Sequence, residues 1–85
     1  MKTIVFAPVA AKQFDALPAD AQAAVESALA RYAVGGFGDV KRLTGVDGLR
    51  LRVGNYRVLF EETGTSIWVA FVGRAARRPI TEDKS

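Results

Sequence analysis

The 85-residue sequence contains no cysteine and no histidine, and these absences narrow its chemistry sharply. Without thiols there are no disulfides, thiolate nucleophiles or zinc–thiolate sites. Without imidazole the commonest general base and a favoured metal ligand are missing, which excludes His- and Cys-based triads and the usual zinc sites. Any catalysis must therefore use Arg, Lys, Asp, Glu, Tyr, Ser or Thr, and we expect no cofactor.

Long apolar runs are also missing. No stretch approaches the ~20 apolar residues of a membrane-spanning helix, and the N-terminal apolar run is too interrupted for a signal peptide. Hydrophobic residues make up 49% of the chain and charged residues 25%, which is typical of globular proteins and argues against disorder. We expect one domain over residues 1–78, a loose tail over 79–85, no membrane partner and a cytoplasmic location.

The net charge of +3 is unevenly distributed along the chain. Residues 31–78 carry nine Lys and Arg against four Asp and Glu, whereas the segments on either side are each net negative. Most of these cations are arginines, which pair bidentately with phosphate and stack on bases. A localised cationic surface of this kind indicates a polyanionic partner.

Periodicity changes from helical to alternating near Gly38. Before it, a short β-branched strand is followed by apolar stripes at helical spacing, broken at Leu17-Pro18 and ended by Gly35-Gly36. After it, turn signals separate short alternating segments. The predicted fold class is α+β, with helices packed on an antiparallel sheet: an N-terminal strand (2–6), a helical hairpin (8–34) and a four-stranded antiparallel region (40–43, 49–53, 56–62, 67–73).

A two-residue turn at Gly54-Asn55 sets Arg52 opposite Arg57 and Arg50 opposite Leu59. Directly opposed residues share a face, so the three arginines should project from one side of the sheet. The other side is the expected core face and carries Leu49, Leu51, Val53, Tyr56, Val58 and Phe60.

Continuing this register through a four-residue loop at residues 63–66 extends the arginine face to the last strand. Phe60 then faces Val69 and Val58 faces Phe71 on the core side, while the arginine face gains Trp68, Val72 and Arg74. Arg52 opposite Arg57 costs a few tenths of a kcal/mol to ~1, and a bound anion would relieve that repulsion. The plainer interpretation is a solvated polar face, which Glu61 on the same side would partly neutralise.

The ordered motifs over residues 38–74 resemble the RelE/ParE superfamily of bacterial toxin–antitoxin toxins. They are a VKxLxG lead, an RxRxGxYRVxF hairpin and a closing apolar strand that ends in Val72-Gly73. The hairpin motif is more similar to the RelE branch. The resemblance implies a metal-independent, ribosome-dependent mRNA endoribonuclease, in which a 2′-hydroxyl attacks the adjacent phosphate and an antitoxin wraps the toxin.

By position within these motifs, the resemblance implies catalytic roles for the basic residues of the hairpin. Arg50 and Arg52 match the two cations before the turn, and Arg57 matches the arginine expected at the scissile phosphate. Fixed cations that face developing phosphorane charge suit this chemistry. Further cations that we expect to hold RNA backbone, or else to be merely solvated, are Lys41, Arg42, Arg77 and Arg78.

The sequence departs from the RelE pattern at its C-terminal end. The family's acid–base tyrosine falls near Thr81, and Arg74 follows Val72-Gly73 directly, so Arg74 is the expected fourth catalytic cation. Arginine is a poor general base. Glu61 and Glu62 are the remaining proton acceptors to consider, and Glu62 should point to the wrong side.

Two alternative functions stay open at this point. One is a ParE-like inhibitor of DNA gyrase, favoured by the missing acid–base residues and disfavoured by the hairpin motif. The other is a decayed toxin that retains only antitoxin binding. Trp68 would be able to stack on a base, but a lone tryptophan in an apolar strand is more often packing, and we predict packing for both Trp68 and Tyr56.

Overall fold

The structure is a computed structural model that describes residues 2–43 and 48–74. The element order confirms the predicted α+β arrangement of one strand, two helices and four further strands. The elements are β1 (Thr3–Phe6), α1 (Pro8–Asp15), α2 (Ala19–Gly35), β2 (Asp39–Arg42), β3 (Leu49–Val53), β4 (Tyr56–Glu62) and β5 (Ser66–Arg74).

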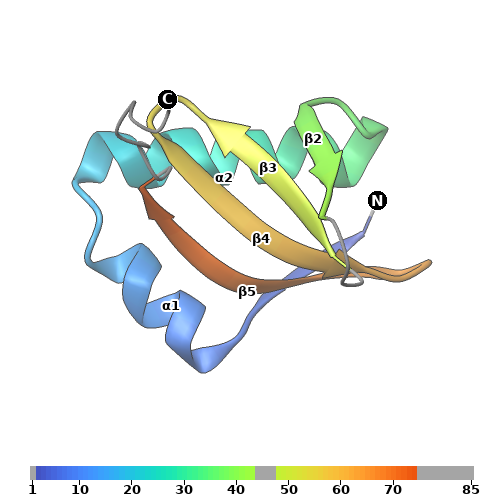
Figure 1. Ribbon diagram of the computed structural model, residues 1–85, viewed down its shortest axis with the longest axis horizontal. Helices are drawn as coiled ribbons and strands as arrows, with labels where there is room; N and C mark the ends of the chain where they lie inside the picture. The colour runs from blue at the N-terminus through green and yellow to red at the C-terminus, as the bar shows by residue number, and fades with distance from the viewer. Residues whose placement is uncertain (1, 44–47, 75–85) are drawn as a thin grey trace, which may run out of the picture.

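The strands form one five-stranded sheet in the order β1-β5-β4-β3-β2, as Figure 1 shows. Strands β2 to β5 pair antiparallel with their chain neighbours, as predicted. The first strand adds a fifth member by pairing parallel with β5, from Thr3 opposite Ser66 to Phe6 opposite Val69. The parallel pair is possible because both helices and the meander lie between the two strands in sequence.

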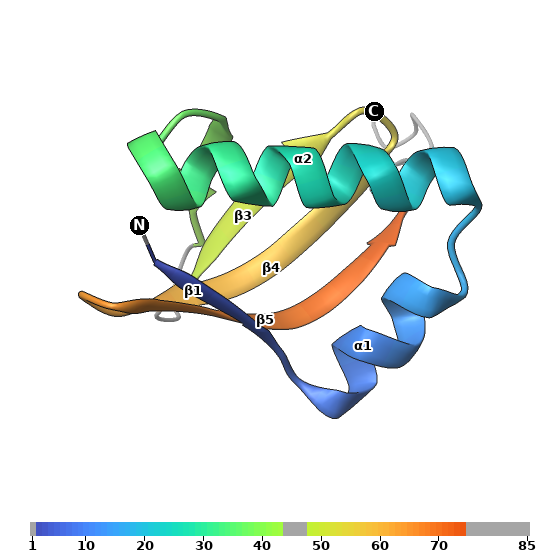
Figure 2. The ribbon, with the colours of Figure 1, turned by 180° about the vertical axis from the view of Figure 1, so that it is seen from behind.

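Helix α2 lies across one face of the sheet, α1 lies beside β5, and the other face is left open (Figures 1 and 2). Pro8 stands in the first turn of α1, where its missing N–H costs nothing. The helices part at Leu17-Pro18, and α2 ends at Gly36, whose φ of 75° is left-handed backbone that glycine adopts without strain. Neither helix is long and apolar enough to span a bilayer.

The core lies between α2 and the helix-facing side of β3, β4 and β5. Val25, Ala28 and Leu29 give α2 the predicted buried stripe, and Ala10 is the buried residue of α1. The largest fully buried side chain is that of Phe60, and the edge of the Tyr32 ring packs against it with a centroid separation of 5.3 Å. Alternation along β3 and β4 therefore separates the core residues from the residues on the other side of the sheet, as predicted.

The predicted register between β4 and β5 is correct next to the turn, for Phe60 and Glu61, and wrong for residues 56–59 of β4. Phe60 pairs with Val69, but Leu59 pairs with Phe71, so Ala70 is an extra residue in a β-bulge. The bulge shifts the alternation by one: Val72, predicted on the arginine face, is 2% exposed in the core, and Phe71 moves to the open face. The Gln13 side chain secures this arrangement, because its Oε1 accepts the Val72 N–H at 2.9 Å.

A polar cluster ties the start of the chain to the end of β4. Lys2 Nζ donates to Glu62 Oε2 at 2.6 Å, and the Tyr32 hydroxyl donates to Glu62 Oε1 at 2.8 Å. The bonds from Lys2 and Tyr32 lower the pKa of Glu62 below its ordinary 4.5. Burial, followed by the bond to Glu62, raises the pKa of Tyr32 above 10.0. Glu62 thus lies on the helix side of the sheet, as predicted, and its carboxylate has a structural role.

Replacing Glu62 with Gln should lower the free energy of unfolding by about 1 kcal/mol at neutral pH, because one ion pair and part of a hydrogen-bond network are lost. A lowered pKa stabilises the fold above pH 4.5 and ceases to do so as the carboxylate is protonated in acid. Denaturant unfolding from neutral to acid pH should therefore show the difference between parent and Glu62→Gln shrinking. A difference that stays constant into acid would contradict this assignment.

Candidate functional site: the open face of the sheet

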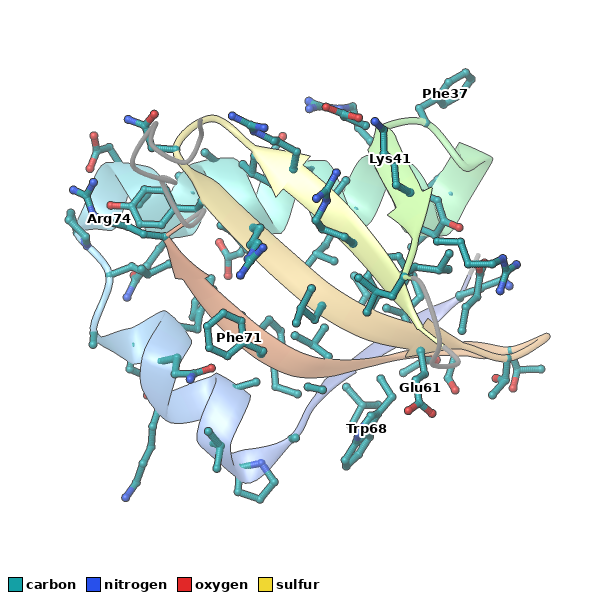
Figure 3. All side chains as sticks on the ribbon, in the orientation of Figure 1. Phe37, Lys41, Glu61, Trp68, Phe71 and Arg74 are labelled. Atoms are coloured by element: carbon teal, nitrogen blue, oxygen red, sulfur yellow. The ribbon has the colours of Figure 1, made fainter. Side chains whose placement is uncertain are left out.

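The side of the sheet away from the helices, here the open face, carries three rows of residues paired across the strands. One row runs Phe71, Leu59, Arg50, Lys41 from β5 to β2; the next runs Gly73, Arg57, Arg52, Asp39; and the third runs Val5, Trp68, Glu61 from β1 to β4. Lys41, Phe71, Glu61 and Trp68 are labelled on this face in Figure 3. The cations gather over β2, β3 and β4.

Three arginines form the centre of the open face, in the pairing predicted from the Gly54-Asn55 turn. Arg52 lies directly opposite Arg57, and Arg50 lies opposite Leu59. Of the two turn residues only Gly54 has a positive φ, 57°, which fits a type II′ turn. This turn type fixes the register of the two strands. Arg50, Arg52 and Arg57, hereafter the arginine cluster, therefore share one surface.

The arginine cluster makes no ion pair within residues 2–43 and 48–74, although Asp39 lies across from Arg52. The ion pair found there is Lys2–Glu62, on the other side of the sheet. The Nε atoms of Arg50 and Arg57 are buried and make no hydrogen bond. The guanidinium groups carry further N–H donors at their ends, and an anion would contact those terminal donors. Three neighbouring guanidinium groups of this kind are able to bind an anionic ligand.

Arg57→Gln should raise the free energy of unfolding by a few tenths of a kcal/mol to ~1, because it removes like-charge repulsion across the β3–β4 pair, and the other cross-strand neighbour of Arg57 is the uncharged Gly73. Denaturant unfolding of the two proteins at low salt measures the gain, and added salt should shrink it by screening. Equal stability of parent and variant at low salt would show that the repulsion is already relieved.

The remaining sequence-predicted cations divide between the two sides. Lys41 lies on the open face opposite Arg50, as a contact with nucleic acid requires. Arg42 lies opposite Leu49 on the helix side, and Arg74 lies opposite Tyr56, with its guanidinium 5.7 Å from that ring's centroid. The prediction that Arg74 joins the arginine face is therefore wrong, because the bulge at Ala70 reverses it. Arg77 and Arg78 lie outside the described residues, as does the predicted tail.

Sequence reasoning missed two residues of the open face. Asp39 lies opposite Arg52 and brings a carboxylate beside the cluster. Alternation along β2 would have placed it if the pairing of that short strand with β3 had been set out. Phe71 was assigned to the core because nothing local marks the bulge. The packing prediction for Trp68 is also wrong, since the residue lies on the predicted face but is 44% exposed there.

What the open face can do follows from its fixed cations. Three arginines and one lysine extend from adjacent strands of the sheet, whose pairing sets their backbone positions before any ligand arrives. Such preorganised charge binds phosphates and stabilises negative charge that develops during phosphoryl transfer. The face therefore combines the binding and the electrostatic elements that a phosphodiester substrate needs.

Comparison with solved structures identifies the fold as that of the RelE toxins. The isolated RelE toxin of E. coli superposes with a TM-score of 0.81 at 17% identity, over 98% of this chain and 94% of that one. The RelE chain of the RelE–RelB complex from Pyrococcus horikoshii gives 0.75 at 20% identity, over 91% and 98%. The YoeB dimer of Staphylococcus aureus gives 0.74 at 14% identity, over 88% and 98%.

No protein-family model and no curated protein sequence matches the chain. The likeness is therefore one of fold, and the function has to be argued from the residues of the open face.

Proposed function

We propose that this chain is the toxin of a type II toxin–antitoxin pair and cuts mRNA on the ribosome. The observation that carries the proposal is the arginine cluster on the open face of a RelE fold, where three guanidinium groups lie together. The phosphates of RNA are acceptors that the terminal N–H groups of arginine pair with bidentately. The RelBE complexes among the structural neighbours support an antitoxin as the partner of this chain.

The proposed reaction needs no group other than the RNA and protein side chains. The 2′-hydroxyl of one nucleotide gives its proton to an acceptor and its oxygen attacks the adjacent phosphorus. The bond to the 5′-oxygen of the next nucleotide breaks, and that oxygen takes up a proton, so a 2′,3′-cyclic phosphate and a 5′-hydroxyl result. The arginine cluster stabilises the phosphorane charge. Proton acceptors described on the open face are the carboxylates Asp39 and Glu61, whereas Glu62 is held by Lys2 and Tyr32 on the other side.

The proposed antitoxin has apolar surface to cover outside the open face. Val34 at the end of α2 and Phe37 just after it are 68% and 70% exposed, and Val9 on α1 is 62% exposed. Exposed apolar residues of this size on helices suit the apolar side of a partner helix. An antitoxin that also reaches the open face would block RNA.

The proposal is tested with purified protein, freed of any antitoxin, added to ribosomes programmed with a defined mRNA. Primer extension then maps any cut. We expect cutting within the codon in the ribosomal A site, and none of the same mRNA without ribosomes.

Absence of cutting by folded protein would overturn the nuclease proposal, and a parallel assay then separates the alternatives. Inhibition of DNA supercoiling by gyrase would assign the chain to the ParE-like class. Inactivity in both assays, together with tight antitoxin binding, would identify a toxin that has kept only its partner.

A further inference from the structure

The open face has an aromatic side as well as a cationic one. Trp68 is 44% exposed on β5, with Val5 of β1 as its neighbour across the parallel pair, and Phe71 is partly exposed three residues further along β5. Figure 3 shows both rings on the face that carries Lys41 and Glu61. Trp68 and Phe71 are hereafter the aromatic strip. Within residues 2–43 and 48–74 Trp68 is exposed and Phe71 partly exposed, so a ligand can reach both rings.

The bulge and a glycine place Phe71 beside the arginine cluster. A Cβ on Gly73 would lie 2.8 and 3.0 Å from atoms of the Phe71 ring, so the ring rests over this glycine. Gly73 is the cross-strand partner of Arg57. Phe71 also heads the row that continues through Leu59 to Arg50, which lies two strand spacings, about 10 Å, away. The Phe71 ring thus lies over the row that contains Arg57 and at the end of the row that contains Arg50.

The two sides together have the composition of a single-stranded nucleic-acid site. Such sites combine a cationic track for the phosphates with aromatic rings on which bases stack. The cluster supplies the track over β3 and β4, and the aromatic strip supplies stacking surface on β5.

We propose that Trp68 and Phe71 form a base-stacking platform for single-stranded RNA whose phosphates lie on the arginine cluster. The inference rests on the proposed function and adds to it the groups that hold the bases. Stacking tolerates any sequence, because every base has a π-face. The platform therefore binds the mRNA without selecting a codon. Its neighbour Glu61, opposite Trp68, limits the cationic track at this end of the face.

The chain carries one tryptophan, so its intrinsic fluorescence reports on Trp68 alone. The parent protein is titrated with a short single-stranded RNA and with an oligonucleotide of the same length and charge that lacks bases. We expect the RNA to quench the tryptophan and the abasic strand to bind, by anisotropy of an end label, without comparable quenching. Equal quenching by both strands would overturn the platform.

Variants test the energetic contribution of the rings. Trp68→Ala should weaken RNA binding roughly 5- to 100-fold, the range for loss of one stacked base, and leave binding of the abasic strand unchanged. Trp68→Phe should restore most of the loss. Gly73→Ala should also weaken RNA binding, because the new methyl group displaces the Phe71 ring. Phe37→Ala is the matched control, since it removes a more exposed ring outside the strip.

The outcomes separate this inference from the proposed function. Base-dependent quenching without mRNA cutting would keep the platform and reject the nuclease. Cutting by Trp68→Ala at the parental rate and KM, with parental RNA affinity, would reject the platform and keep the nuclease. Unchanged RNA affinity of Trp68→Ala with weakened antitoxin binding would assign the strip to the antitoxin and overturn the inference.

Discussion

Arg57→Ala should slow mRNA cutting on ribosomes by about 100-fold or more, the usual effect of removing one preorganised group that stabilises transition-state charge. The loss should fall mainly on kcat, because Arg50, Arg52 and Lys41 remain to bind the RNA backbone. Arg57 lies in the middle of its row, between Arg52 on β3 and Gly73 on β5, and it matches the arginine that the motif places at the scissile phosphate. Single-turnover cutting followed by primer extension measures the rate.

The matched control for Arg57 is Arg31→Ala, which removes the same charge from an exposed position on α2. There the Arg31 side chain contacts only Ser27 of its own helix among the hydrogen bonds of the described residues. Its cutting rate should equal that of the parent. Similar losses in both variants would mean that net charge, rather than the position of a guanidinium group on the open face, drives the activity.

Adding the antitoxin should raise the melting temperature by roughly 16–32 °C. A partner present at a thousand times its Kd, and bound to the folded state alone, stabilises by about 4 kcal/mol. In a domain of this size each kcal/mol shifts Tm by about 4–8 °C. The protein to test is the product of a neighbouring reading frame, and differential scanning fluorimetry measures the shift.

Phe37→Ala and Val34→Ala should each reduce this antitoxin shift, because these residues carry much of the exposed apolar surface at the end of α2. Neither variant removes buried contacts, so the melting temperature of the free protein should stay close to that of the parent. No shift with the neighbouring protein in excess over the parent chain would count against the toxin–antitoxin assignment.

The centre of the open face could be predicted from sequence because a two-residue turn leaves no freedom of register. Once Gly54-Asn55 is the turn, the pairing of Arg52 with Arg57 follows, and strict alternation of residues 49–53 assigns the faces. The helical hairpin was equally predictable, since Leu17-Pro18 and Gly36 interrupt the chain at the points where the helices end.

What could not be predicted depends on contacts between distant segments. The parallel pairing of β1 with β5 joins residues more than sixty positions apart and has no local signal. The bulge at Ala70 results from pairing β5 with β4 while Val69 and Val72 both enter the core. That single extra residue moved Arg74 away from the site and brought Phe71 into it.

The central claim is that the cationic open face promotes attack by an RNA 2′-hydroxyl, and a message with one altered sugar tests it most directly. Ribosomes are programmed with two mRNAs, identical except for a single 2′-deoxyribose at the nucleotide where the parent message is cut. The account predicts cutting of the parent message in the A site and none at the deoxy position, because the nucleophile is missing. Cutting at the deoxy position, or failure to cut either message, would contradict it.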